Sequence, residues 1–235
     1  MPQVPSIDVI GLAWFVIVWL GYTVYTDRGS PRRHSLRAAM HRNRYRWMAQ
    51  LLTRENRIAD ASILGQLASG ASFFASTTVL ILVGLFTVLG ATNEAVGVLR
   101  QIPFAGRITP NQWELRLFVL IVIFVHAFFK FTWALRQFNY VGVLIGAAPS
   151  GKGSGSEDWV RRTAWLSTLA SKDYNQGLRA YYFGLAVLAW FISAWLFMVA
   201  TALVVTVLYW REYRSGALRT MELAVDANSK VDMMP

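Results

Sequence analysis

The sequence has no cysteine and few charged residues for its length. Without cysteine it has no disulfides, no thiolate metal ligands and no thiol nucleophile. Only 15% of its 235 residues are charged, whereas an ordinary soluble domain has about 25%. By contrast, 55% of the residues are hydrophobic, and they are gathered into long blocks. Such a composition is typical of a polytopic membrane protein.

Four apolar stretches are long enough to cross a bilayer, which takes about 20 residues in a helix. We predict spans over about 7–26, 72–89, 115–135 and 183–210. The residues before the first stretch include no Lys or Arg, so we expect a retained helix rather than a cleaved signal peptide. The prediction is all-α: a single four-helix membrane domain over 1–214 with cytoplasmic amphipathic or interfacial helices, then a tail over 215–235.

The segments between these stretches differ in charge. Residues 27–70 carry nine arginines against three acidic residues, whereas 91–114 and the tail from Arg211 are neutral. Residues 138–180 have five basic and three acidic groups. Because basic loops stay in the cytoplasm, this pattern predicts a bacterial inner (cytoplasmic) membrane protein with both termini on the non-cytoplasmic side. Cleavage of the first stretch would leave this loop assignment unchanged.

Two segments share features with ligand-binding motifs. His41–Met48 alternates basic and aromatic residues, as nucleic-acid binders do, but beside a membrane this composition predicts an interfacial anchor. Gly146–Lys152 matches the start of a phosphate-binding loop, yet Gly153 stands where that motif requires Ser or Thr. We therefore predict a flexible linker over 150–156, followed by a helix against the membrane or the first loop, and no nucleic-acid partner.

Small residues recur along the second stretch at Gly65, Ser69, Ser72 and Ser76. Their spacing of four, three and four places them on one helical face, where another helix can approach closely. We predict helix packing there, with a ligand groove as the alternative.

The third stretch contains His126 and Lys130, four residues apart and on one helical face. Polar groups at membrane depth are functional candidates. In one interpretation, Lys130 and Arg136 extend to headgroups or inner-loop carboxylates, while His126 bonds to a neighbouring helix. In the other they line a pocket or anion path that opens to the cytoplasm. Because His34 and His41 are in the basic loop, an intrachain bis-histidine haem is not expected, and no metal or other cofactor is predicted.

Three motifs occur in an order and spacing that resemble one protein family: Phe73–Thr77, Lys130–Tyr140 and Asn175–Tyr182. They are similar to domain-of-unknown-function family 599, and the similarity covers roughly residues 7 to 212. The resemblance implies a multi-pass membrane protein without an assigned activity, and it supplies no catalytic residues.

The polar ends of these motifs fall at the cytoplasmic ends of the predicted spans. We predict that they form one cluster there, with the members Arg57, Asp60, Lys130, Arg136, Gln137, Asn139, Tyr140, Asn175 and Arg179. Within the cluster, Asp60 is predicted to pair with Arg57, Lys130, Arg136 or Arg179.

No catalytic constellation is visible, so the sequence does not indicate an enzyme. The leading hypothesis is an accessory or scaffold subunit that docks onto a larger membrane protein complex. The alternative is a homo-oligomeric channel or transporter for a small anion, since Lys130 and Arg136 favour anions. The third is a protein that binds a lipid or quinone through His126. Expected partners are membrane lipids and either an integral-membrane protein or further copies of the chain.

Overall fold

The computed structural model describes residues 6–28, 35–99, 109–149 and 155–221. The elements are α1 (Ser6–Arg28), α2 (Leu36–Leu51), α3 (Ile58–Gly90), α4 (Thr92–Leu99), α5 (Pro110–Gly146), α6 (Ser156–Leu188), the 3-10 helix η1 (Ala189–Phe191) and α7 (Ala194–Tyr213). No strand occurs among the described residues, and the all-α prediction is confirmed. His34 and most of the predicted 150–156 linker lie outside the described residues.

Four of the described helices are long and apolar enough to cross a membrane: Ser6–Asp27, Ile58–Gly90, Pro110–Gly146 and Ala194–Met221. The helices α3 and α5 have 33 and 37 residues, so each is about 50 Å long or more. The hydrocarbon core of a bilayer is only about 30 Å thick. Both helices are therefore longer than one crossing requires.

The predicted span over 183–210 is wrong in its boundaries, because the structure divides it. The helix α6 ends at Leu188, η1 follows, and α7 begins at Ala194. The Ser193 hydroxyl accepts a hydrogen bond from the Leu196 N–H at 3.0 Å, which is how an N-cap residue starts a new helix. An unbroken apolar run thus contains a turn.

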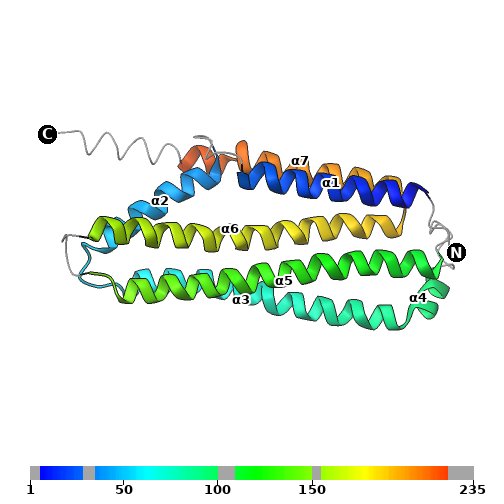
Figure 1. Cartoon of the computed structure of the whole chain (residues 1–235), viewed down its shortest axis with the longest axis horizontal. Helices are drawn as coiled ribbons and strands as arrows, with labels where there is room; N and C mark the ends of the chain where they lie inside the picture. Colours follow the sequence, from blue (N-terminus) through cyan, green and yellow to red (C-terminus); the bar gives the residue numbers. More distant parts are fainter. Residues whose placement is uncertain (1–5, 29–34, 100–108, 150–154, 222–235) are drawn as a thin grey trace. The chain divides into compact units, whose positions relative to one another are not determined.

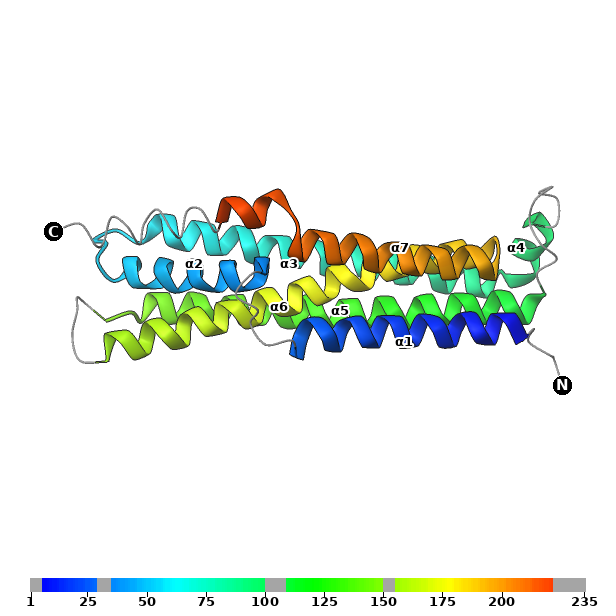
Figure 2. The same ribbon diagram turned by 90° about the horizontal axis from the view of Figure 1, so that it is seen from above.

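Ring contacts show that the chain reverses at this turn. Phe15 of α1 lies 5.8 Å from Phe183 of α6 and 5.2 Å from Phe197 of α7, between ring centroids. Phe183 and Phe197 are on opposite sides of η1 in sequence, and Trp190 of η1 stacks on Phe197 at 4.8 Å. The helix α7 therefore runs back antiparallel to the end of α6, as Figures 1 and 2 show.

The chain forms two compact units. Unit 1 comprises Met1–Arg28, Phe73–Phe131 and Asn175–Thr206, and unit 2 comprises Gly29–Ser72, Thr132–Tyr174 and Val207–Pro235. The helices α3, α5, α6 and α7 each contribute one segment to each unit.

Unit 1 has an aromatic interior. The ring of Tyr181 on α6 makes edge contacts with Phe74, Phe124 and Phe131, at centroid distances from 5.2 to 5.7 Å. A Cβ atom at Gly177 would lie 2.7 Å from the Phe131 ring, so glycine is what permits α6 to approach α5 here. Large apolar side chains cover the outside of the unit 1 segment of α3, as lipid contact requires; the most exposed are Leu80, Phe73 and Val83.

Unit 2 has an aliphatic core drawn from four helices. Its fully buried members include Met48 and Leu51 of α2, Phe138 and Val141 of α5, and Ala164 of α6. The predicted interfacial segment His41–Met48 is helical, as expected, because it lies in α2. Trp47 and Met48 of this segment pack into the core, whereas Tyr45 is exposed. The helix predicted after the linker is α6.

Candidate functional site

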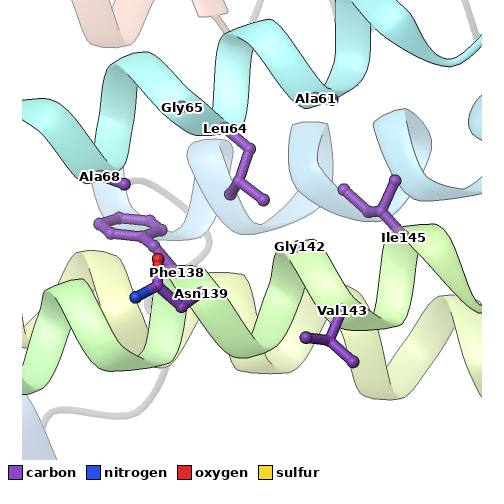
Figure 3. Close-up of a pocket in the computed structure, with 9 residues that line it drawn as sticks. All are labelled: Ala61, Leu64, Gly65, Ala68, Phe138, Asn139, Gly142, Val143 and Ile145. Atoms are coloured by element: carbon purple, nitrogen blue, oxygen red, sulfur yellow. The ribbon is translucent and has the colours of Figure 1, made fainter.

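Unit 2 contains an open groove of about 420 Å³ between α3 and α5 (Figure 3). The residues that line it are mostly small or apolar: Ala61, Leu64, Gly65 and Ala68 from α3, and Phe138, Asn139, Gly142, Val143 and Ile145 from α5. A Cβ atom at Gly142 would meet Leu64 Cδ2 at 3.3 Å, so a small residue keeps the two helices close at the floor. Asn139 is the polar side chain of the lining.

The predicted packing face of α3 is uncovered in the structure. Gly65, Ser69, Ser72 and Ser76 are all exposed, and a Cβ atom at Gly65 would meet no atom within 4 Å. The buried residues of α3 lie on a different face: Asp60, Leu64, Ala71, Ala75 and Thr78. No helix of the described chain therefore packs on the small-residue face. Gly65 belongs both to this face and to the lining of the groove.

Asp60 is fully buried in unit 2 and has partners that the sequence prediction missed. Its carboxylate accepts a hydrogen bond from Trp47 Nε1 at 2.6 Å and forms an ion pair with Arg54. Arg57, one of the four predicted partners, instead donates to the carbonyl oxygens of Ala148 and Pro149, at 3.2 and 3.3 Å. The predicted pairing is thus wrong, because the short α2–α3 connection brings Arg54 to the carboxylate.

Three further predicted residues of unit 2 have different environments. Gln137 is buried, and its Nε2 donates to Asp173 Oδ2 at 2.7 Å, which joins α5 to α6. Arg136 is exposed and lies over the Trp133 ring at 6.0 Å. Tyr140 is also exposed. Of the three, only Gln137 belongs to a buried polar contact.

The helix α2 brings a histidine and several arginines to α6. His41 Nδ1 lies 2.9 Å from the Thr168 hydroxyl, and its ring makes an edge contact with Trp165. Burial, with the nearby positive charges of Arg44 and Arg42, lowers the pKa of His41. Burial also lowers the pKa of Arg44, to about 10. At neutral pH the imidazole is therefore uncharged and Arg44 is charged.

Unit 1 contains a buried ion pair that sequence reasoning missed. Asp8 of α1 is 3% exposed and accepts from Arg116 Nη2 at 3.2 Å, Gln112 Nε2 at 2.9 Å and Trp190 Nε1 at 2.7 Å. Arg116 is equally buried and also lies over the Trp190 ring, 5.4 Å from its centroid. This cluster ties α1, α5 and η1 together at one end of unit 1.

A second carboxylate of unit 1 holds one of the predicted residues. Arg179 of α6 is buried and donates to Asp27 Oδ1 at 3.0 Å, and Gln176 also donates to this carboxylate. The Arg179 guanidinium lies 6.0 Å from the Tyr22 ring centroid, while its Nη1 has no hydrogen-bond partner within the described chain. Asn175, one turn earlier, is exposed.

His126 and Lys130 are on the α5 segment of unit 1. The His126 side chain is exposed and Lys130 is partly exposed. Trp19 of α1 contacts the imidazole edge-on at 5.8 Å.

The predicted polar cluster thus divides between the two units. Lys130, Asn175 and Arg179 belong to unit 1, and the other six members belong to unit 2. Charge divides as well: the described part of unit 2 has thirteen Lys or Arg against six Asp or Glu, whereas that of unit 1 has four of each. Among the described residues, no group of three or more His, Asp or Glu is placed to hold a metal ion.

Comparison with known proteins gives one match. The family model "Protein of unknown function, DUF599" matches residues 10–217. The chain belongs to this family. The match confirms the resemblance of the three sequence motifs, and the four apolar helices of this DUF599 protein agree with the expected multi-pass character. No curated protein and no solved structure matched the chain.

Proposed function

We propose that this DUF599 protein is an accessory or scaffold subunit of a membrane protein complex, which holds a helix of its partner in the α3–α5 groove of unit 2. The observation that carries the proposal is the exposed small-residue face of α3 beside that groove. Small residues let two helix backbones approach closely, and an apolar groove between helices is a common way to receive a third helix.

The charge of unit 2 favours the cytoplasmic side of the membrane for the groove. The described part of unit 2 has thirteen basic against six acidic groups, and basic segments stay on the cytoplasmic side. Unit 1 is apolar, with equal numbers of basic and acidic groups, and so suits the hydrocarbon. The four helices that are apolar enough to cross include α7 but not α6. Because α7 runs back antiparallel to the end of α6, we take α6 as a fifth crossing. With five crossings, Ser6 starts on the non-cytoplasmic side and residues 207–221 end on the cytoplasmic side, so this proposal replaces the expectation that both termini share one side.

The partner helix that fits this surface has an apolar stripe with acidic residues beside it. The stripe would lie on Ala61, Gly65, Val143 and their neighbours, which offer little polar surface. The acidic residues would meet the excess of positive charge in unit 2, which steers and orients such encounters. A helix that extends from an integral-membrane subunit into the cytoplasm can carry both the apolar stripe and the acidic residues.

The test is to fill the groove without disturbing the fold. Gly65→Leu places a side chain where no atom lies within 4 Å, so the variant should fold like the wild type. A photo-crosslinking residue at Val143, which is 70% exposed in the groove lining, should join the wild-type chain to one partner of defined mass. The crosslink should map to an apolar helix with acidic flanks, and Gly65→Leu should abolish it.

Gly84→Leu is the matched control, because Gly84 lies on the same helix, also has no neighbour within 4 Å, and is not in the groove. It should leave the crosslink intact. If Gly65→Leu crosslinks as well as the control does, or if the crosslink forms only to lipid, the docking proposal fails.

A further inference from the structure

We infer that unit 2 binds a phosphate group between α2 and α6, with the Arg44 guanidinium and the Thr163 and Ser167 hydroxyls as its donors. All three residues belong to unit 2, and none of them lines the α3–α5 groove. The phosphate is that of a lipid headgroup or that of a soluble phosphate ester, since both present the same oxygens. The site is independent of the docking proposal, and either can fail alone.

The first observation is an arginine on the core side of α2. Arg44 lies four residues before Met48 and seven before Leu51, so it shares a helical face with two fully buried core residues. It forms no hydrogen bond and no ion pair with any described residue, and it is partly exposed, so a ligand can reach it. Burial lowers its pKa to about 10 and no carboxylate opposes this shift. A desolvated cation without a counter-charge is unfavourable, which points to an anion from outside the chain.

The second observation is a pair of buried hydroxyls on α6. Thr163 and Ser167 are both 0% exposed, and neither hydroxyl oxygen has a hydrogen-bond partner within the described part of the chain. They are four residues apart, beside Ala164 of the unit 2 core. Hydroxyls in helices often donate to the carbonyl one turn earlier, as those of Thr168 and Ser171 do. Because a buried hydroxyl without a partner costs free energy, Thr163 and Ser167 each have a hydrogen bond left to make.

The third observation is the register of the two helices. Figures 1 and 2 show α2 and α6 antiparallel, and His41 Nδ1 lies 2.9 Å from the Thr168 hydroxyl. Arg44 is three residues farther along α2, about 4.5 Å at 1.5 Å per residue. The same distance back along α6 from Thr168 ends between Thr163 and Ser167. The guanidinium and the two hydroxyls are therefore at one level of the unit 2 core.

Donors from two helices suit a tetrahedral oxyanion. The guanidinium fork of an arginine holds two oxygens of a phosphate, which leaves further oxygens for the hydroxyls of α6. A planar carboxylate has only two oxygens and fits this donor set less well. The local charge also favours an anion, since the positive charges of Arg44 and Arg42 both act on the neighbouring His41.

Thermal unfolding of the full chain in a detergent without phosphate groups tests the site, because a ligand that binds the folded state raises the unfolding midpoint. The probes are inorganic phosphate and phosphatidylglycerol. A rise with both identifies a site open to soluble phosphate, and a rise with phosphatidylglycerol alone identifies a lipid site. Arg44→Met should weaken the apparent affinity for the active probe by about tenfold or more, because hydrogen bonds to charged groups are strong.

Ser167→Ala gives a readout that a purely structural role would not. Without a probe its midpoint should equal or exceed that of the wild type, because it removes a buried hydroxyl without a partner. Its affinity for the probe should nevertheless fall several-fold, and this readout remains where Arg44→Met fails to fold. Arg162→Met is the matched control, since Arg162 is 77% exposed in its ion pair with Asp158 on the same helix; it should respond like the wild type.

A wild type whose midpoint rises with neither probe would overturn the inference. So would equal losses of affinity in Arg44→Met and Arg162→Met, which would show a general effect of charge. A lower midpoint of Ser167→Ala without a probe would also contradict it, by showing that the hydroxyl already has a partner in the folded protein.

Discussion

At the scale of single residues, the Asp8–Arg116 ion pair is a buried polar contact with several hydrogen bonds. Both side chains are buried, and the carboxylate receives three donors from two other elements. A buried pair of this kind adds little net stability over an apolar pair, but removal of one partner leaves an uncompensated charge. The pair therefore fixes how α1 meets α5 and η1.

Arg116→Met should lower the free energy of unfolding by about 3–5 kcal/mol, because Asp8 would stay buried without its counter-charge. Denaturant or thermal unfolding in detergent measures the loss. Arg161→Ala is the control: Arg161 is 75% exposed in its ion pair with Asp158, and such surface pairs contribute about 1 kcal/mol or less. Equal losses in the two variants would contradict the role given to Asp8.

The sequence contains a weak signal for this pair, in the positions of the two charged residues. Asp8 and Arg116 both stand near the starts of apolar stretches that the charge pattern predicts to enter the membrane from the same side, so opposite charges at equal depth could have been matched. The Arg54–Asp60 pair was harder to foresee. It depends on how α2 turns into α3, and the sequence does not specify that turn.

At the scale of elements, the main lesson comes from α6, η1 and α7. The run over 183–210 is apolar throughout and includes Gly184 but no proline, so hydropathy alone favours one helix. Ser193 marks the new start as its N-cap, and a serine before an apolar run is a recognised start signal. The positions of α1, α3 and α5 were predictable from their apolar stretches, but α3 begins at Ile58 and α5 ends at Gly146, beyond the predicted spans over 72–89 and 115–135.

The contact between α2 and α6 should depend on pH through His41. Burial and nearby arginines lower the pKa of this imidazole in the folded state, below the ordinary value of 6.5. The stability that it contributes is present above that value, and it is lost as the pH falls towards the lowered pKa, because the unfolded chain binds the proton more readily. The unfolding midpoint should therefore fall on acidification below about pH 6.5.

His41→Gln keeps a polar partner for Thr168 and removes the titration. Its unfolding midpoint should change less between pH 7.5 and 5.5 than that of the wild type. A wild-type slope that survives in His41→Gln would show that another group is responsible.

At the scale of the whole molecule, the excess of positive charge belongs to unit 2, whereas the described part of unit 1 has equal numbers of basic and acidic residues. The sequence predicted the basic cytoplasmic segment from its arginines, and unit 2 gathers those residues with parts of α5, α6 and the residues after Thr206. What the sequence could not indicate is that Glu212 lies with the Arg-rich segment, where its carboxylate accepts from the Arg37 N–H at 3.2 Å. That contact follows from the reversal at η1.

The most direct test of the account is the side of the membrane on which residues 207–221 lie. The chain has no cysteine, so single cysteines can be labelled without background. In intact cells, a membrane-impermeant thiol reagent should label Asn93→Cys, at the exposed start of α4, and should leave Arg219→Cys unlabelled until the cells are opened. Labelling of both residues in intact cells would contradict the five-crossing arrangement and the cytoplasmic position of the groove.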